Sequence, residues 1–265
     1  MRVALAFLKR DFLIAISYKA DFLFQLAGIF GTVPAFYFLS RLYGGGAHLP
    51  ARYGNDYFSF MLIGVAFTDY LVLSLKTFNT SLRESQLMGT LETILLSPTR
   101  IRGLLLYSSV WGYVLTTLRF VLYLAAGLLF GLRLEHANAP AAIAILLLAV
   151  ASFAGLGILI ATVTLVTKRG ELLVTGITAL SGLLCGVLFP VELLPRWLQK
   201  AAAFIPMTHA LEGLRMALVE GLPTARLLPQ FQALALFALV LLPAGLLSFS
   251  LAIRWAKTSG TLAQY

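Results

Sequence analysis

Hydrophobic positions along the chain form long, almost unbroken runs that are separated by short polar stretches. An α-helix rises about 1.5 Å per residue, so a run of about 20 apolar residues can cross a hydrocarbon core about 30 Å thick. The pattern therefore predicts six membrane-spanning helices. We expect these spans at residues 22–42, 57–78, 104–131, 140–167, 171–189 and 230–253.

The composition also indicates lipid rather than water as the main solvent. Hydrophobic residues make up 60% of the chain and charged residues 12%, whereas a soluble domain carries about a quarter charged residues. The net charge is +9, but the basic residues lie in short segments between the spans rather than in one compact patch. We therefore expect anionic lipid headgroups as partners, and no nucleic acid.

The distribution of basic residues predicts how the chain is oriented. An even number of spans places both termini on one side of the membrane. If that side is the cytoplasm, twelve Lys and Arg residues lie inside and seven outside, with Arg119 within a span. The positive-inside rule favours this arrangement. The expected fold is an all-α integral membrane protein with its N- and C-termini in the cytoplasm.

Two cytoplasmic segments break the apolar pattern. Residues 1–21 mix apolar and basic positions, and we expect either a helix in the membrane interface or an extension of the first span. In residues 82–96, Leu87, Leu91 and Ile94 recur at helical spacing among polar residues, which predicts an amphipathic helix. The membrane surface or the groove of a soluble partner could bury its apolar side.

The outer segment, residues 190–228, is punctuated by prolines. Pro190, Pro195 and Pro206 predict two or three short helices, because proline is disfavoured inside a helix. Trp197 suits the headgroup boundary. A partly apolar segment that is too broken to cross the membrane is interpreted as re-entrant or interfacial on the outer side.

Asp69 and Arg119 are the charged residues that fall deep within predicted spans. Each lies about 12 residues from the outer end of its span, which places both about 18 Å deep at the helical rise. A charge at that depth is unfavourable by several kcal/mol unless it is paired or hydrated. We expect an ion pair that either fixes the second and third spans together or lines a route for a substrate or protons.

Two glycine pairs have the spacing that lets helices approach closely, namely Gly127 with Gly131 and Gly182 with Gly186. They predict packing seams within one bundle or a contact between two chains. Cys185 is the single cysteine and lies in an apolar run, which rules out an intrachain disulfide.

Catalytic motifs are lacking in the sequence. It contains neither the GxxxxGK[ST] loop that cradles nucleotide phosphates nor a GxSxG elbow. The three histidines, His48, His136 and His209, are scattered and lack metal-ligand spacing. We expect no catalytic residue, no metal site and no cofactor in this chain.

Two segments between the predicted spans have distinctive motifs. Residues 88–100 read MGTLETILLSPTR after the second span, and residues 186–215 contain FP, LP, PxT and a following Arg between the fifth and sixth spans. The first resembles the GTLE-x-LL-x-SP segment of the ABC-2 type permeases, the membrane subunits of ABC exporters, and the second is similar to that family's motif at the same place. The resemblance covers essentially the whole chain and implies one transmembrane domain, residues 1–265. It assigns an outer re-entrant gate to Phe189, Pro190, Pro195, Pro206, Thr208 and Arg215.

The resemblance further implies an interfacial helix at 1–21, a coupling helix at 82–96 and a re-entrant hairpin at 190–228. In such exporters two permease chains pair with two ATPase chains, which bind the ATP and Mg. A homodimer is expected because no second permease half is fused to this chain. The implied ATPase-docking residues are Arg83, Glu84, Gly89, Thr90, Leu91 and Glu92, with a smaller contact from Lys168, Arg169 and Glu171.

The first span resembles the branch of the family that exports drugs, lipids or other amphipathic molecules. Residues 20–41 contain a deep proline, Pro34, and no Trp, unlike the signature of polysaccharide exporters. A polysaccharide or glycolipid exporter remains an alternative, as do a proton-coupled secondary transporter that uses Asp69 and a non-transporting anchor. We expect a bacterial plasma (inner) membrane location.

Overall fold

A computed structural model describes residues 19–42, 56–87, 101–134, 136–167 and 170–258, and all regular structure in these ranges is helical. The long helices are α2 (Lys19–Leu42), α3 (Tyr57–Leu87), α5 (Ile101–Leu129), α6 (Ala139–Thr167), α7 (Gly170–Leu184) and α10 (Leu228–Thr258). Four short helices lie between α7 and α10, namely η3 (Val191–Leu193), α8 (Arg196–Ala203), α9 (Pro206–Leu218) and η4 (Thr224–Leu227).

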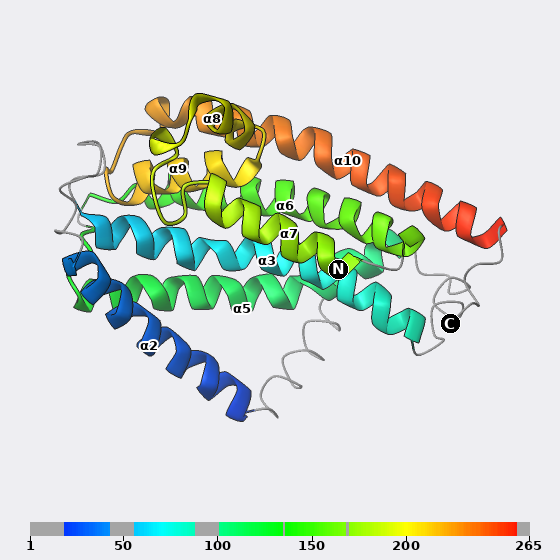
Figure 1. Ribbon diagram of the computed structural model, residues 1–265, viewed down its shortest axis with the longest axis horizontal. Coiled ribbons are helices and arrows are strands. Elements are labelled where there is room, and N and C mark those ends of the chain that lie inside the picture. Colours follow the sequence, from blue (N-terminus) through cyan, green and yellow to red (C-terminus); the bar gives the residue numbers. More distant parts are fainter. Residues whose placement is uncertain (1–18, 43–55, 88–100, 135, 168–169, 259–265) are drawn as a thin grey trace.

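The long helices run between two ends of the molecule (Figure 1). Helices α3, α6 and α10 begin at the end where α8 and α9 lie, and α5 and α7 finish there. We call this the α8–α9 end, and the opposite end, where α3 stops, the Leu87 end. The sequence predicts the former as the outer side and the latter as the cytoplasmic side.

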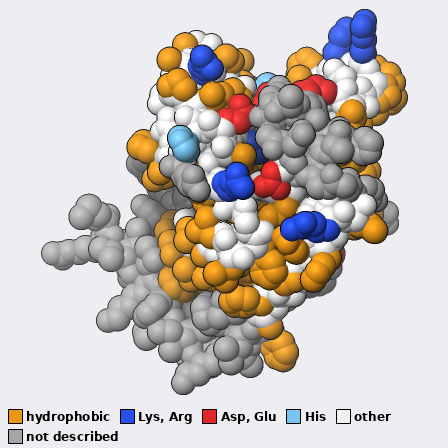
Figure 2. Space-filling view, turned by 90° about the vertical axis from the view of Figure 1, so that its left-hand side faces the viewer, with side chains coloured by type: hydrophobic (Ala, Val, Ile, Leu, Met, Phe, Trp, Pro, Cys, Tyr) orange, Lys and Arg blue, Asp and Glu red, His pale blue; other side chains and the backbone are white. Residues whose placement is uncertain are grey.

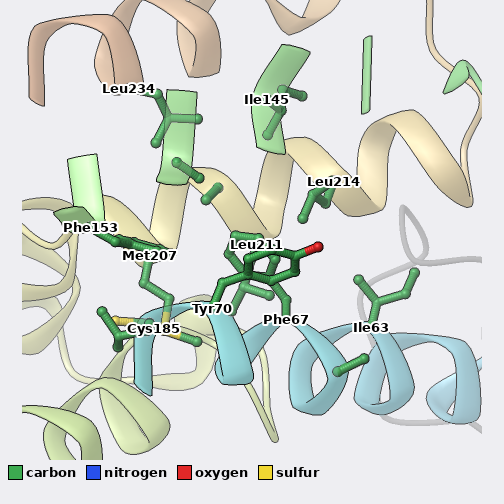
Figure 3. Packing of buried hydrophobic residues seen from close by; sticks show 14 of the residues in the cluster. Ile63, Phe67, Tyr70, Ile145, Phe153, Cys185, Met207, Leu211, Leu214 and Leu234 are labelled. Carbon is green, nitrogen blue, oxygen red and sulfur yellow. The ribbon is translucent and has the colours of Figure 1, made fainter. Parts of the chain in front are cut away.

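Helix α3 forms the centre of the bundle. In an apolar 18-residue window of Tyr57–Thr80, 72% of the residues are buried, against 17% in a window of the same length in Thr224–Trp255 at the edge of the bundle. Phe67 of α3 packs against Tyr70 and against Phe153 of α6, with ring centroids 5.5 and 5.7 Å apart. Met207 of α9 joins this cluster (Figure 3). The short outer helix α9 is therefore part of the core.

Helices α6 and α10 pack closely because small residues lie between them. A side chain on Gly155 would clash with the backbone of Leu241 and Leu242 on α10. The Ser152 hydroxyl donates a hydrogen bond to the Leu234 carbonyl at 3.1 Å. Such close backbone approach and interhelical hydrogen bonds are typical of helix packing in lipid.

Four helices in the described residues are long and apolar enough to cross a membrane. They are Tyr57–Thr80, Val110–Leu129, Ala139–Leu165 and Thr224–Trp255. Helix α7 is a shorter apolar helix of 15 residues. The predicted all-helical membrane fold is confirmed at this level, while the count of six spans and the orientation stay predictions.

Two helix ends differ from the predicted spans. The part of α3 that is long and apolar enough to cross a membrane is Tyr57–Thr80, which agrees with the predicted span 57–78, but the helix itself continues to Leu87, so residues 82–87 form its last turns. No Gly or Pro occurs between Gly64 and Gly89 to interrupt it. The fifth span was expected to reach residue 189, but α7 ends at Leu184.

Glycines at helix ends explain the second difference. Gly186 has a φ of 79° and follows α7, and Gly131 has a φ of 98° and follows α5. Glycine adopts such positive φ values without the steric penalty of a side chain, so it commonly ends helices. Of the two predicted packing pairs, Gly127 does lie at a close contact, with the Leu62 side chain of α3, whereas no other helix among the described residues comes within 4 Å of the Cβ position of Gly182, and Gly131 and Gly186 lie just after helix ends.

Candidate functional site

The incompletely buried residues of α3 form a continuous stripe along one face of the helix. Asp69, Val72, Lys76 and Thr80 lie on it at spacings of three and four residues, which place side chains on the same face. Thr68 lies beside Asp69 and is also half-buried. We call Thr68, Asp69, Lys76 and Thr80 the polar stripe of α3.

Two hydrogen bonds fix α3 and α5 in an antiparallel register. The Tyr70 hydroxyl of α3 donates to the Thr117 hydroxyl of α5 at 3.0 Å. One turn further along α3, the hydroxyls of Ser74 and Tyr113 lie 2.7 Å apart. A step of four residues forward along α3, from Tyr70 to Ser74, thus corresponds to a step of four residues back along α5, from Thr117 to Tyr113. The same register places Asp69 of α3 at about the level of Arg119 of α5.

Asp69 and Arg119 interact electrostatically across the α3–α5 contact. Both side chains are half-buried. Within the described residues no salt bridge joins the two, and the Arg119 Nε is a buried donor without a hydrogen-bond partner. The structure brings the predicted pair together, and the direct ion pair stays a prediction.

Three of the predicted ATPase-docking residues are described by the structure, and all three lie at the Leu87 end. Arg83 and Glu84 lie in the last turns of α3, and Glu171 is exposed in the first turn of α7. The other predicted docking residues lie outside the described residues; these are Gly89, Thr90, Leu91, Glu92, Lys168 and Arg169.

The start of α7 packs directly on α3 at this end. A Cβ on Gly170 would clash with the side chains of Asn79 on α3 and Thr164 on α6. Asn79 and Thr164 are themselves buried. The described parts of the two segments predicted to contact an ATPase, residues 82–87 and 170–171, therefore lie at the same end of the bundle.

Prolines divide the outer segment as the sequence predicts. Pro190 and Pro195 precede η3 and α8, and Pro206 is the first residue of α9. The backbone N–H groups at the start of a helix have no hydrogen-bond acceptor within the helix, so proline, which lacks an N–H, loses no hydrogen bond there. Thr208, the third residue of α9, is buried and its hydroxyl donates to the Ala202 carbonyl at 2.7 Å. Phe189 is half-buried before η3.

Arg215 connects three elements at the α8–α9 end. It lies on α9 and is 3% exposed. Its Nη2 donates to the Phe60 carbonyl of α3 at 2.8 Å and to the Val187 carbonyl, after α7, at 3.3 Å. Its Cζ lies 3.5 Å from the centroid of the Phe60 ring. We call Arg215 with these two carbonyls and this ring the Arg215 clamp.

The partners of Arg215 could not be identified from the sequence. Phe60, Gly64 and Val187 are ordinary apolar or small residues of predicted spans, and only the fold brings them to α9. Nearby, the Tyr57 hydroxyl donates to the Leu188 carbonyl at 2.9 Å. Figure 2, which faces the α8–α9 end, shows basic and acidic side chains among hydrophobic ones there.

A comparison with protein families matches residues 51–247 to the model for "ABC-2 family transporter protein". The chain belongs to the ABC-2 family. The match begins before α3 and extends into α10, so it includes the polar stripe and the Arg215 clamp. A comparison with curated proteins gives no match.

Family membership defines the general role of the chain. ABC-2 proteins are membrane components of ABC transporters and are not themselves catalytic enzymes. This permease is accordingly a multi-pass membrane transport protein, as its long apolar helices also indicate. The family implies a partner ABC ATPase subunit.

Proposed function

We propose that this permease is the membrane subunit of an ATP-driven exporter with six spans. Two copies form the translocation path, and each couples to one copy of a separate ATPase through residues 82–96. The cargo is a drug-like, lipid or other amphipathic molecule, and the protein lies in a bacterial plasma membrane with both termini in the cytoplasm.

The continuity of α3 is the observation that carries this proposal. Its 31 residues correspond to a length of about 46 Å, which exceeds a hydrocarbon core of about 30 Å. The excess lies at the Leu87 end, directly before the segment with the GTLE motif. A displacement of that segment is transmitted through an unbroken helix to the core and to the Arg215 clamp.

The polar stripe of α3 supports a path for amphipathic cargo. Asp69, Lys76 and the threonines alternate along the same face with half-buried Val65, Val72 and Leu73. A face with both kinds of side chain can contact the polar and the apolar part of one molecule. The buried Arg119 Nε beside Asp69 offers a donor to a cargo oxygen or to water.

Docking is tested by purifying the permease with the Walker-type ATPase of a neighbouring reading frame. We expect Glu92→Arg and Gly89→Trp to reduce the ATPase recovered with the permease at least tenfold. Arg226→Gln is the matched control, because Arg226 is exposed in η4 at the other end and should leave recovery unchanged. Normal recovery with both docking variants would contradict the coupling assignment.

The energy source and cargo class are tested in proteoliposomes that contain the permease and the ATPase. Fluorescent NBD-phosphatidylethanolamine and a cationic amphipathic dye serve as cargo probes. We expect ATP to drive the movement of at least one probe in the presence of a protonophore. Movement that ignores ATP and stops with the protonophore would instead establish a proton-coupled transporter.

A further inference from the structure

The Arg215 clamp is a buried cation whose partners come from separate elements. One nitrogen, Nη2, bonds to carbonyls of both α3 and the turn after α7, and the guanidinium lies over the Phe60 ring. Desolvating a guanidinium is unfavourable unless carbonyls, a ring face or an opposite charge replace its water. The clamp therefore holds these elements together for as long as Arg215 stays buried.

Two glycines show how closely the elements fit. A Cβ on Gly64 of α3 would clash with the Val187 carbonyl and lie 2.8 Å from the Arg215 Nη2. Gly186 adopts a φ of 79° to turn the chain toward that contact. The Tyr57 hydroxyl adds a bond from α3 to the Leu188 carbonyl. The turn after α7 thus has several contacts with the first two turns of α3.

We propose that Arg215 is a positioning residue that locks the outer segment, residues 190–228, and the turn after α7, residues 185–189, to the first turns of α3, so that they move as one body. Helix α5 belongs to the same body, because the hydrogen bonds of Tyr70 and Ser74 fix it to α3. The inference rests on the proposed function in one respect, namely that this body moves during an ATP-driven cycle. When the translocation path opens, the outer segment and α3 therefore do not separate from each other.

The lock is tested on the isolated permease by the distance between two spin labels. In a Cys185→Ala background, Trp197→Cys labels α8 and Leu129→Cys labels the end of α5; these side chains are 70% and 80% exposed. We expect one narrow distance distribution with Arg215 present. Arg215→Gln should broaden it about twofold, because a neutral amide lacks the charge that holds both carbonyls.

Arg215→Lys separates positioning from general stability. Since one nitrogen makes both hydrogen bonds, a lysine ammonium can replace it, and we expect the narrow distribution to return. Arg226→Gln is the matched control, because Arg226 is exposed on η4. A narrow distribution with Arg215→Gln, or one equally broad with Arg215→Lys, would overturn the proposal.

Gly64→Ala provides a second test in case Arg215→Gln does not insert. The added methyl group pushes against the Val187 carbonyl while Arg215 remains, so the distribution should again broaden. A narrow one would overturn the lock.

Joint movement is tested in the complex with the ATPase. We expect the wild-type label distance to be unchanged between the nucleotide-free and the ATP–vanadate-trapped complex, and a shift would overturn the proposal. If the ATPase does not bind, the proposed function fails while the measurements on the isolated permease still decide on the lock.

Discussion

At the scale of single residues, two arginines lie in the apolar bundle at different degrees of burial. Arg215 is held by backbone carbonyls and an aromatic ring, and it is almost fully buried. Arg119 is half-buried, and its electrostatic interaction is with the carboxylate of Asp69. The first arrangement joins backbones and suits a structural contact. The second leaves the Arg119 Nε as a donor without a hydrogen-bond partner among the described residues, beside the charge of Asp69. This arrangement suits a site at which water or cargo can bind and leave.

The Asp69–Arg119 interaction predicts coupled effects of substitution. We expect Asp69→Asn and Arg119→Gln each to lower the stability of the permease, because each leaves one charge without its neighbour. The double variant should lose less than the sum, by about 1 kcal/mol, as is typical of residues in contact. Thermal unfolding of the four proteins in one detergent measures this difference, and strictly additive losses would show that the two charges do not interact.

At the scale of elements, α8 has the features of an interfacial helix. Arg196, Trp197, Lys200 and Phe204 lie on its exposed side, and Trp197 and Phe204 are 70% and 81% exposed. The opposite side buries Ala202 against the molecule. Aromatic side chains with a polar edge and snorkelling cations are enriched where headgroups meet acyl chains. The helix is therefore expected to lie on the membrane with this side in the lipid.

The placement of α8 predicts quenching of Trp197 by lipid. In a variant with Trp111→Phe and Trp255→Phe, Trp197 is the single tryptophan, because the sequence has three. We expect its fluorescence to be quenched most by lipids brominated near the headgroup and less by lipids brominated near the bilayer centre. Trp111, kept alone as the control, lies within α5. Equal emission of Trp197 with and without brominated lipid would show that α8 faces water.

At the scale of the whole molecule, the two ends have different structural features. The outer segment and the clamp lie at one end of α3, and the exit to the GTLE motif lies at the other. This separation has functional meaning only if the ends face opposite sides of a membrane, as the distribution of basic residues predicts.

Cysteine labelling tests this orientation in a Cys185→Ala background. Arg226→Cys lies at the α8–α9 end and Glu171→Cys at the Leu87 end, and both native side chains are exposed. A membrane-impermeant maleimide should label position 226 in intact cells and position 171 only after permeabilisation. The reverse pattern would invert the orientation and place the GTLE motif on the outer side.

The sequence by itself determined the membrane class, the family and the approximate positions of the long apolar helices. Long apolar runs have few alternatives in lipid, because an unpaired backbone there is strongly unfavourable, so the helices follow from hydropathy alone. The prolines at 190, 195 and 206 divide the outer segment as predicted, because their effect is local. The matching level of Asp69 on α3 and Arg119 on α5 was predictable for the same reason, since helical rise is constant.

Only the tertiary structure decided which side chains meet. The register of Tyr70 with Thr117 and the contact of Arg215 with Phe60 and Val187 link residues far apart in the chain, and hydropathy carries no information on the facing of apolar helices. The extension of α3 to Leu87 was likewise missed, because a polar helix leaving the membrane has the same pattern as a separate amphipathic helix. Local chemistry thus fixed the elements, while packing fixed their partners.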